Sequence, residues 1–265
     1  MKRLLKNGIN HIAVLIKFYY LKFSKNYKKV DISNPKTIPI IIISFNQLFY
    51  LKDLIFTLHK WNYNNIIIID NASTYKPLID YFDEIKEQVS IHRLKRNYGH
   101  MVFWKKRELF MLYGKSYYIV TDADIVPYKE CPEDFLLYFK NLLDKNKGIT
   151  KVGFSLKIDD IPESNPNKQK VIKWESKFWE QKIDGGYFYA EIDTTFALYR
   201  PKENPVNKNF YRAIRTGPPY IAKHGGWYID SENLTKEQKY YMETSNSSSS
   251  WRLDENGNLI NEEYK

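Results

Sequence analysis

Near the middle of the chain the sequence runs Tyr117-Tyr118-Ile119-Val120-Thr121-Asp122-Ala123-Asp124-Ile125-Val126-Pro127. Its apolar, β-branched start is typical of a buried strand, and Pro127 is expected to end that strand. Functional groups of a parallel sheet lie beyond the carboxyl ends of its strands, so Asp122 and Asp124 are expected to face a crevice. Two hard oxygen ligands at this spacing suit Mg²⁺ or Mn²⁺, although an Asp-rich turn is the simpler explanation for an isolated pair.

Alternating strand and helix patterns precede this segment. Strands are expected at residues 38–43, 66–69 and 89–94, and helices near 48–58, 77–87 and 103–112. The first strand is apolar throughout, as is typical of a strand buried on both faces. Repeated units of this length predict an α/β fold with a Rossmann-like, mostly parallel nucleotide-binding sheet and helices on both faces.

The second half of the chain has a less regular pattern. A helix is expected to begin at Pro132, followed by a strand over 151–156 and a polar loop over 157–170. Gly185 and Gly186 precede a strand-like segment over 187–199. An acidic helix and a serine run follow Trp227.

The positive charge is concentrated at the N-terminus. The net charge is +10, yet residues 1–30 hold eight Lys or Arg and no acid, and the rest has 33 basic and 31 acidic residues. This distribution predicts three parts: a basic amphipathic arm over 1–36, one enzyme domain over 37–240 and a polar tail over 241–265. The arm could lie on an anionic membrane, or it could pack on the domain with solvated lysines. A nearly neutral body argues against a nucleic-acid partner.

The remaining composition restricts the choice of function. The hydrophobic fraction of 43% and the charged fraction of 27% are those of a globular protein. Cys131 is the single cysteine, so the chain contains neither an internal disulfide nor a zinc site built on several thiolates.

Polar residues follow all four expected parallel strands. They are Ser44 and Asn46 after the first, Asp70 after the second, Arg96 and Asn97 after the third, and Asp122 and Asp124 after the fourth. Turns favour Asn, Asp and Ser, so each residue alone is a weak signal. Together they predict a nucleotide site, in which Asp70 accepts hydrogen bonds from a base or ribose and Arg96 meets phosphate.

With these motifs the chain resembles family 2 glycosyltransferases of the GT-A fold. The resemblance is clearest from Pro39 to Pro127, where Ser-Phe-Asn, Asp-Asn-Ala-Ser, Arg-Asn-Tyr-Gly and Asp-Ala-Asp follow successive strands. It implies that Ser44, Asn46, Asp70, Arg96, Asn97 and Asp122 bind the nucleotide, and that Asp122 and Asp124 hold the metal, Mn²⁺ or Mg²⁺.

The resemblance also implies a glycine loop, an acidic base on the acceptor side and a late histidine on the metal. Gly185 with Gly186, Asp193 and His224 follow one another in that order. The acidic motif departs from the family pattern because Ile192 separates Glu191 from Asp193. Strand alternation would put both carboxylates on one face, so either could be the base, and Asp193 is favoured.

The implied function is metal-dependent, inverting transfer of a sugar from a nucleotide-sugar donor, with UDP favoured, to a hydroxyl of a glycan or glycolipid acceptor. Its expected place is surface-polysaccharide biosynthesis in the cytoplasm, peripheral on the inner face of a membrane. A nucleotidyltransferase is disfavoured, because residues 44–48 contain no glycine for a phosphate-wrapping loop. The sequence is also compatible with a non-catalytic GT-A-like protein, or with a membrane- or nucleic-acid-binding protein that acts through the arm.

Overall fold

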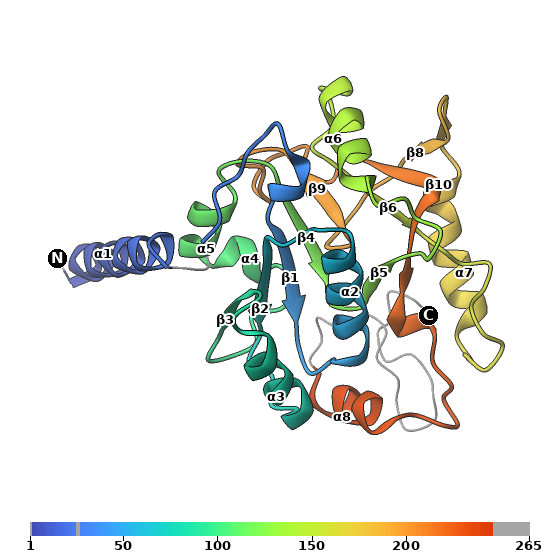
Figure 1. Cartoon of the computed structure of the whole chain (residues 1–265), viewed down its shortest axis with the longest axis horizontal. Coiled ribbons are helices and arrows are strands. Elements are labelled where there is room, and N and C mark those ends of the chain that lie inside the picture. Colours follow the sequence, from blue (N-terminus) through green and yellow to red (C-terminus); the bar gives the residue numbers. More distant parts are fainter. Residues whose placement is uncertain (1, 25–26, 246–265) are drawn as a thin grey trace.

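A mixed sheet with helices on both faces forms the centre of the protein (Figure 1). The computed structural model describes residues 2–24 and 27–245, with side chains from residue 11 onward, so the predicted tail lies outside the described residues from 246 on. The predicted α/β class, with a largely parallel central sheet, is confirmed. The strands are β1 Ile40–Ser44, β2 Ile66–Asp70, β3 Ser90–Arg93, β4 Tyr118–Asp122, β5 Ile125–Pro127, β6 Lys151–Leu156, β7 Lys182–Ile183, β8 Tyr187–Tyr189, β9 Ala197–Tyr199 and β10 Ala213–His224.

Helices connect most of these strands. The α-helices are α1 Lys2–Lys22, α2 Phe49–Lys60, α3 Lys76–Ile85, α4 Val102–Lys105, α5 Arg107–Tyr113, α6 Phe135–Lys145, α7 Lys168–Ser176 and α8 Lys236–Thr244. Three short 3₁₀ helices are η1 Pro35–Thr37, η2 Lys177–Trp179 and η3 Gly225–Trp227. Helix α8 continues past the boundary predicted at residue 240.

The strand order is β3-β2-β1-β4-β9-β6-β10-β8-β7, and β5 pairs with β10. The first four strands in this order are parallel. Strand β9 runs antiparallel between β4 and β6, whereas β10 is parallel to β6. The carboxyl ends of β1, β2, β3 and β4 therefore share one edge of the sheet, as predicted.

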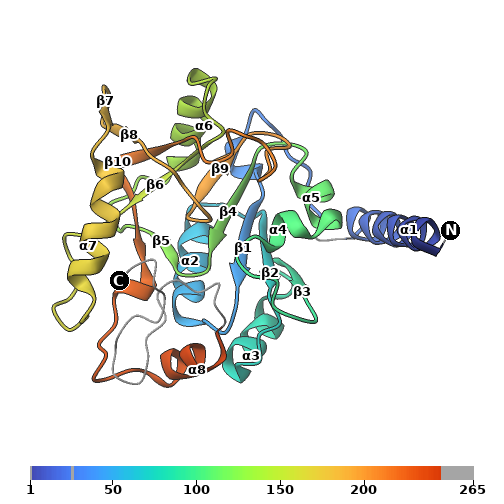
Figure 2. The same cartoon turned by 180° about the vertical axis from the view of Figure 1, so that it is seen from behind.

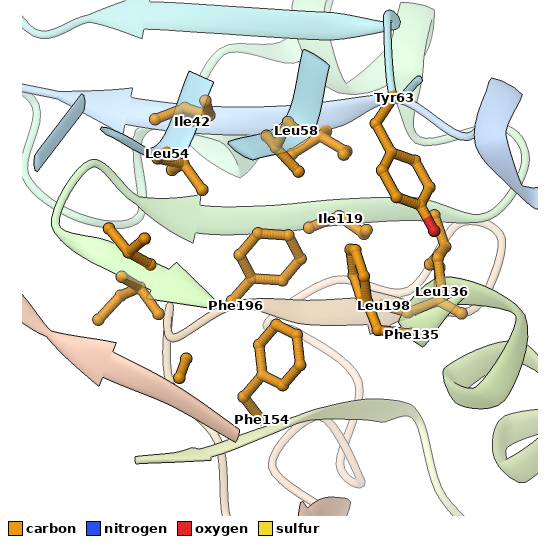
Figure 3. Packing of buried hydrophobic residues seen from close by; sticks show 14 of the residues in the cluster. Ile42, Leu54, Leu58, Tyr63, Ile119, Phe135, Leu136, Phe154, Phe196 and Leu198 are labelled. Atoms are coloured by element: carbon orange, nitrogen blue, oxygen red, sulfur yellow. The ribbon is translucent and has the colours of Figure 1, made fainter. Parts of the chain in front are cut away.

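Alternate residues of the parallel strands enter two separate cores. Ile40 and Ile42 of β1 face α2, α3 and α6, and this cluster is drawn in Figure 3. Ile41 and Ile43 face α4, α5 and Phe18 of α1 on the opposite side. This two-sided burial explains why β1 and β2 contain unbroken isoleucine runs rather than an alternating pattern.

Several predicted elements differ from the structure. The helix predicted over 103–112 is two helices, because the backbone at Lys106 leaves the helical region. The strand predicted over 187–199 is split, because β8 pairs with β10 while β9 pairs with β4 and β6. The loop predicted over 157–170 ends at α7, which begins at Lys168. Pro127 does end a strand, but that strand is the separate β5, antiparallel to β10.

The C-terminal part of helix α1 packs on the domain beside α5, and the rest of the helix extends beyond the domain (Figures 1 and 2). Phe18 is buried in the second core, and Lys17 Nζ lies 2.8 Å from Glu108 Oε1 of α5. Of the two alternatives for the arm, packing on the domain thus applies around Phe18, although Lys17 is paired there and not merely solvated. Among the residues that the structure describes, no helix has both the length and the apolar character needed to cross a bilayer.

Candidate active site

A cleft of about 2070 Å³ opens at the carboxyl ends of β1 to β4. Its lining includes Phe45, Asn71 and Ala123, which directly follow β1, β2 and β4, and Asn97 from the loop after β3, so the sheet edge forms its floor. Helices α7 and α8, strand β8 and the segment 190–195 provide much of the opposite wall. Of the predicted site residues, Asn97, Asp122, Asp124, Glu191, Asp193 and His224 line it.

Asp122 ends β4, and Asp124 lies in the two-residue turn between β4 and β5. The amide of Ala123 donates to the Ile43 carbonyl at 3.1 Å, which fixes this turn to β1. Thr194 donates its hydroxyl to Asp122 Oδ2 at 2.8 Å. Burial, and then the neighbouring Asp124 carboxylate, raise the pKa of Asp122 well above its usual range. The hydrogen bond from Thr194 offsets this rise in pKa only in part.

Sheet pairing brings a histidine to this turn. In the β5–β10 register His224 lies opposite Ile125, the residue after Asp124. Its Nδ1 is 3.6 Å from Asp124 Oδ2, and its ring stacks on Trp227 with centroids 4.7 Å apart. A Cβ atom at Gly226 would lie 3.0 Å from the imidazole and 3.3 Å from Asp124 Oδ2, so only glycine leaves this pair undisturbed.

The donor set fits a divalent cation that shares its coordination with a substrate. No group of three or more His, Cys, Asp or Glu residues within the described ranges is arranged to hold an ion by itself. Asp122, Asp124 and His224 nevertheless offer carboxylate oxygens and an imidazole nitrogen, and buried His224 Nδ1 has no hydrogen-bond partner among described residues. Mg²⁺ and Mn²⁺ commonly take few protein ligands and complete the shell with phosphate and water.

Both candidate bases face the cleft. Glu191 and Asp193 are exposed, whereas Ile192 between them is fully buried, so the two carboxylates project from the same side of this irregular segment. Asp193 Oδ2 lies 4.0 Å from His100 Nε2. The next residue, Thr194, bonds Asp122, so Asp193 is held next to the predicted metal site.

A buried arginine fixes the other end of this segment. Arg215 Nε donates to the Glu191 carbonyl at 2.9 Å, and its guanidinium forms a buried ion pair with Glu175 of α7. The guanidinium also lies 3.9 Å from the centre of the Phe178 ring. Arg215 thereby joins α7, η2 and the segment that carries both candidate bases.

Two predicted nucleotide ligands lie inside the fold. Asn46 is buried at φ 48°, and its Oδ1 accepts from the amides of Thr74 and Tyr75 at 2.7 and 3.0 Å. Asp70 is also buried, and it accepts from the Ser73 amide at 2.9 Å and from Arg93 Nε at 3.1 Å. Neither side chain lines the cleft. Their contacts hold the loops that follow β1 and β2.

Besides Asp122, three further nucleotide candidates occupy different environments. Ser44 is buried, and its hydroxyl has no hydrogen-bond partner within the described part of the chain. Arg96 is exposed and packs on the Tyr98 ring at 4.7 Å, outside the cleft lining. Asn97 lines the cleft and accepts from the Gly99 amide at 2.8 Å. Asn97 is therefore the one of the three placed to meet a ligand directly.

The sequence matches no protein-family model and no curated protein. Among solved structures, the mannosyltransferase PcManGT from Pyrobaculum calidifontis, in complex with GDP-Man and Mn²⁺, is similar over 90% of this chain and 70% of its own, at 14% identity and a TM-score of 0.45. Residues 1–349 of S. aureus TarS, in complex with UDP-GlcNAc, match over 77% of this chain and 65% of that chain, at 12% identity and a TM-score of 0.43.

GalNAc-T7 with UDP, GalNAc and Mn²⁺ is also similar, over 70% of this chain and 43% of that chain, at 13% identity and a TM-score of 0.42. The chain thus spans less than two thirds of the TarS and GalNAc-T7 structures. With TM-scores below 0.5 the likeness is distant, and it assigns no role to any residue of this chain.

Sequence reasoning missed the cleft residues His100, Thr194 and Tyr50, and the wall formed by α8. Burial and the Asp124 carboxylate raise the pKa of Tyr50 to about 12. No local pattern distinguishes these three side chains, because their importance comes from contacts with distant residues. The helix expected after Trp227 is α8, which begins with a capping box formed by Thr235 and Gln238, but its place in the cleft wall was not expected.

Proposed function

We propose that this protein is a metal-dependent GT-A glycosyltransferase that moves a sugar from a nucleotide-sugar donor to a hydroxyl of a glycan or glycolipid acceptor. A UDP-sugar is the favoured donor. The observation that carries the proposal is the meeting, in one cleft, of the Asp122–Asp124 turn, His224 and Asp193. The Thr194–Asp122 hydrogen bond of 2.8 Å connects the carboxylates proposed for the metal to the segment of the proposed base.

The donor side of this chemistry uses the carboxyl ends of β1 to β4. Departure of a nucleoside diphosphate leaves negative charge on phosphate oxygens, and a bound Mn²⁺ or Mg²⁺ would neutralise it there. Asp122, Asp124 and His224 would hold that ion. Asn97 would contact the donor from the next loop, while Asn46 and Asp70 keep the surrounding loops in place. Ser44 and Arg96 remain proposed nucleotide residues whose contacts would require a local rearrangement.

On the acceptor side, a carboxylate must take the proton of the attacking hydroxyl. Asp193 is exposed to the cleft and is our proposed general base. Attack from its side, opposite the leaving diphosphate, inverts the anomeric centre. Glu191 is the alternative base, because it projects into the same cleft.

The size of the cleft supports a two-substrate reaction. Pockets for one small ligand are typically about 300–1,000 Å³. The cleft of about 2070 Å³ is larger than this range and has room for a donor beside an acceptor.

We place the reaction in surface-polysaccharide assembly at the inner face of a membrane, with the basic arm as the supporting feature.

Calorimetric titration of UDP, GDP and CDP tests the proposal. We expect one nucleotide, UDP first, to bind in the presence of Mn²⁺ and to lose most of its affinity when a chelator is added. In the Asp124→Asn variant the nucleotide should bind equally well with Mn²⁺ and with chelator, and the melting temperature should not fall. If all three nucleotides fail to bind the folded wild-type protein with Mn²⁺, the proposal is wrong.

A further inference from the structure

Helix α1 has a second apolar face that the domain does not cover. Large apolar side chains recur on it at helical spacing, and their exposed fractions are 59% for Ile12, 66% for Ile16, 53% for Tyr19, 76% for Tyr20 and 80% for Phe23. Spacings of three, four and seven residues place these side chains along one side of a helix. We name these five residues the outward stripe.

The outward stripe is distinct from the face by which α1 is attached. Phe18 is only 5% exposed and packs in the core with Leu21 at its edge. The ammonium of Lys115 lies 4.6 Å from the centre of the Phe18 ring, and Lys17 pairs with Glu108. Because these contacts fix the rotation of α1, the stripe faces away from the domain rather than alternating between two sides.

A surface helix normally presents polar side chains outward, so a contiguous apolar stripe indicates a partner. The stripe includes two tyrosines, and tyrosine is enriched where an apolar phase meets water. Tyr19 and Phe23 stack with centroids 6.5 Å apart, which makes part of the stripe one continuous aromatic surface.

Charge identifies the kind of partner. Residues 1–30 contain eight Lys or Arg and no Asp or Glu, and the rest of the chain is nearly neutral. An anionic lipid surface attracts such a segment by about 1 kcal/mol for each nearby basic residue, and it accepts apolar side chains at the depth of its headgroups. A second copy of this chain would instead bring two strongly basic arms together.

We propose that the outward stripe of α1 inserts into an anionic lipid surface, with α1 lying in the plane of the membrane. The inward face, anchored by Phe18 and the Lys17–Glu108 ion pair, would hold the catalytic domain against that surface. This inference rests on the membrane location given in the proposed function and does not depend on the chemistry in the cleft.

Flotation of the full-length protein with vesicles provides the test. One set contains phosphatidylglycerol mixed with phosphatidylcholine, and the other contains phosphatidylcholine alone. We expect binding to the anionic vesicles to exceed binding to the neutral ones at least tenfold and to weaken as salt is raised. The double variant Ile16→Gln/Phe23→Gln should lose at least tenfold in binding to the anionic vesicles.

Phe56 on α2 supplies a matched control, because its side chain is 68% exposed but lies on the domain. Phe56→Gln should bind vesicles as wild type does. Equal binding of wild type to both vesicle types, or unchanged binding of the double variant, would overturn the proposal. Sedimentation of a dimer that the double variant abolishes would identify a second copy as the occupant and overturn it too. Calorimetric nucleotide binding should stay unchanged in the double variant, which keeps this outcome separate from that of the proposed function.

Discussion

Asn46 and Asp70, near the carboxyl ends of β1 and β2, differ from Asp122 and Asp124, at the carboxyl end of β4, in one respect: contacts within the protein occupy both side-chain polar atoms of Asn46 and of Asp70. Asp70 receives an amide and a guanidinium, and both amide atoms of Asn46 are used, one of them by Thr244 Oγ1 at 2.8 Å. Asp122 and Asp124 instead lie close together, and Asp124 faces an imidazole 3.6 Å away.

Both groups occur at strand ends of the same edge, and both consist of the residue types that turns favour. The difference shows that a carboxylate at a strand end becomes a fold-stabilising group when the neighbouring loops supply donors. It remains available to a ligand when they do not. The first group is therefore expected to affect stability, and the second to affect chemistry.

The largest effect is expected at Asp193. Asp193→Asn should lower turnover by roughly 10²–10⁴-fold, because loss of a general base has about that cost. The melting temperature should stay near that of wild type, since the side chain is 59% exposed. Steady-state transfer kinetics and thermal unfolding measure the two quantities. If Glu191→Gln causes the larger loss instead, the base is Glu191.

Lys151 extends the comparison to a buried cation. It is fully buried on β6 within 4.0 Å of the Phe210 ring centre, and its ammonium has no hydrogen-bond partner among the described residues. Burial lowers the pKa of Lys151 from 10.5 to about 7. Between these two pH values the unfolded chain binds more protons, so wild-type stability rises with pH across this interval.

Lys151→Met should therefore be more stable than wild type at pH 6, by on the order of 2–4 kcal/mol, and the gap should narrow toward pH 10. Chemical denaturation at several pH values measures it. Lys173→Met, at an exposed position of α7, should show no such dependence. If the difference in the free energy of unfolding between Lys151→Met and wild type did not change with pH, Lys151 would not be a buried group with a lowered pKa.

The next largest effect is expected when one aspartate of each group is replaced by asparagine. Asp70→Asn should lower the free energy of unfolding by about 2–3 kcal/mol, because a buried carboxylate loses charge-assisted hydrogen bonds. Asp124→Asn should leave the free energy of unfolding unchanged or raise it, because it relieves repulsion with Asp122. Urea denaturation without metal measures the free energy of unfolding of both variants. Equal losses in the two variants would remove the distinction between the groups.

The smallest effect is expected at Gly226. Gly226→Ala places a methyl group against His224 and Asp124, so Mn²⁺-dependent nucleotide affinity should fall by about threefold to tenfold, or about 1 kcal/mol. Gly148→Ala is the control, because a Cβ there meets nothing within 4 Å. Calorimetry with Mn²⁺ compares the two variants. A Gly226→Ala protein with wild-type affinity would show that the His224–Asp124 contact does not matter to the ligand.

The alternation of strands and helices, the burial of β1 on both faces and the position of the aspartates at the end of β4 were predictable from local pattern. Periodicity in apolar residues directly reflects which face of an element is buried, so these features need no knowledge of distant contacts. The prediction was less accurate after residue 157, because β8 and β9 have only three residues each and β10 pairs with β5, β6 and β8, which are remote from most of it in the sequence.

The sequence by itself determined that this chain forms an α/β sheet whose edge presents Asp122 and Asp124, and that its N-terminal arm is basic. Only the tertiary structure decided which polar residues are left unsatisfied. The β5–β10 register places His224 beside Asp124, the loops after β1 and β2 satisfy Asn46 and Asp70, and the rotation of α1 turns one apolar stripe outward. The packing of elements that are remote in sequence decides which groups become hydrogen-bond partners, and the local composition does not determine that packing.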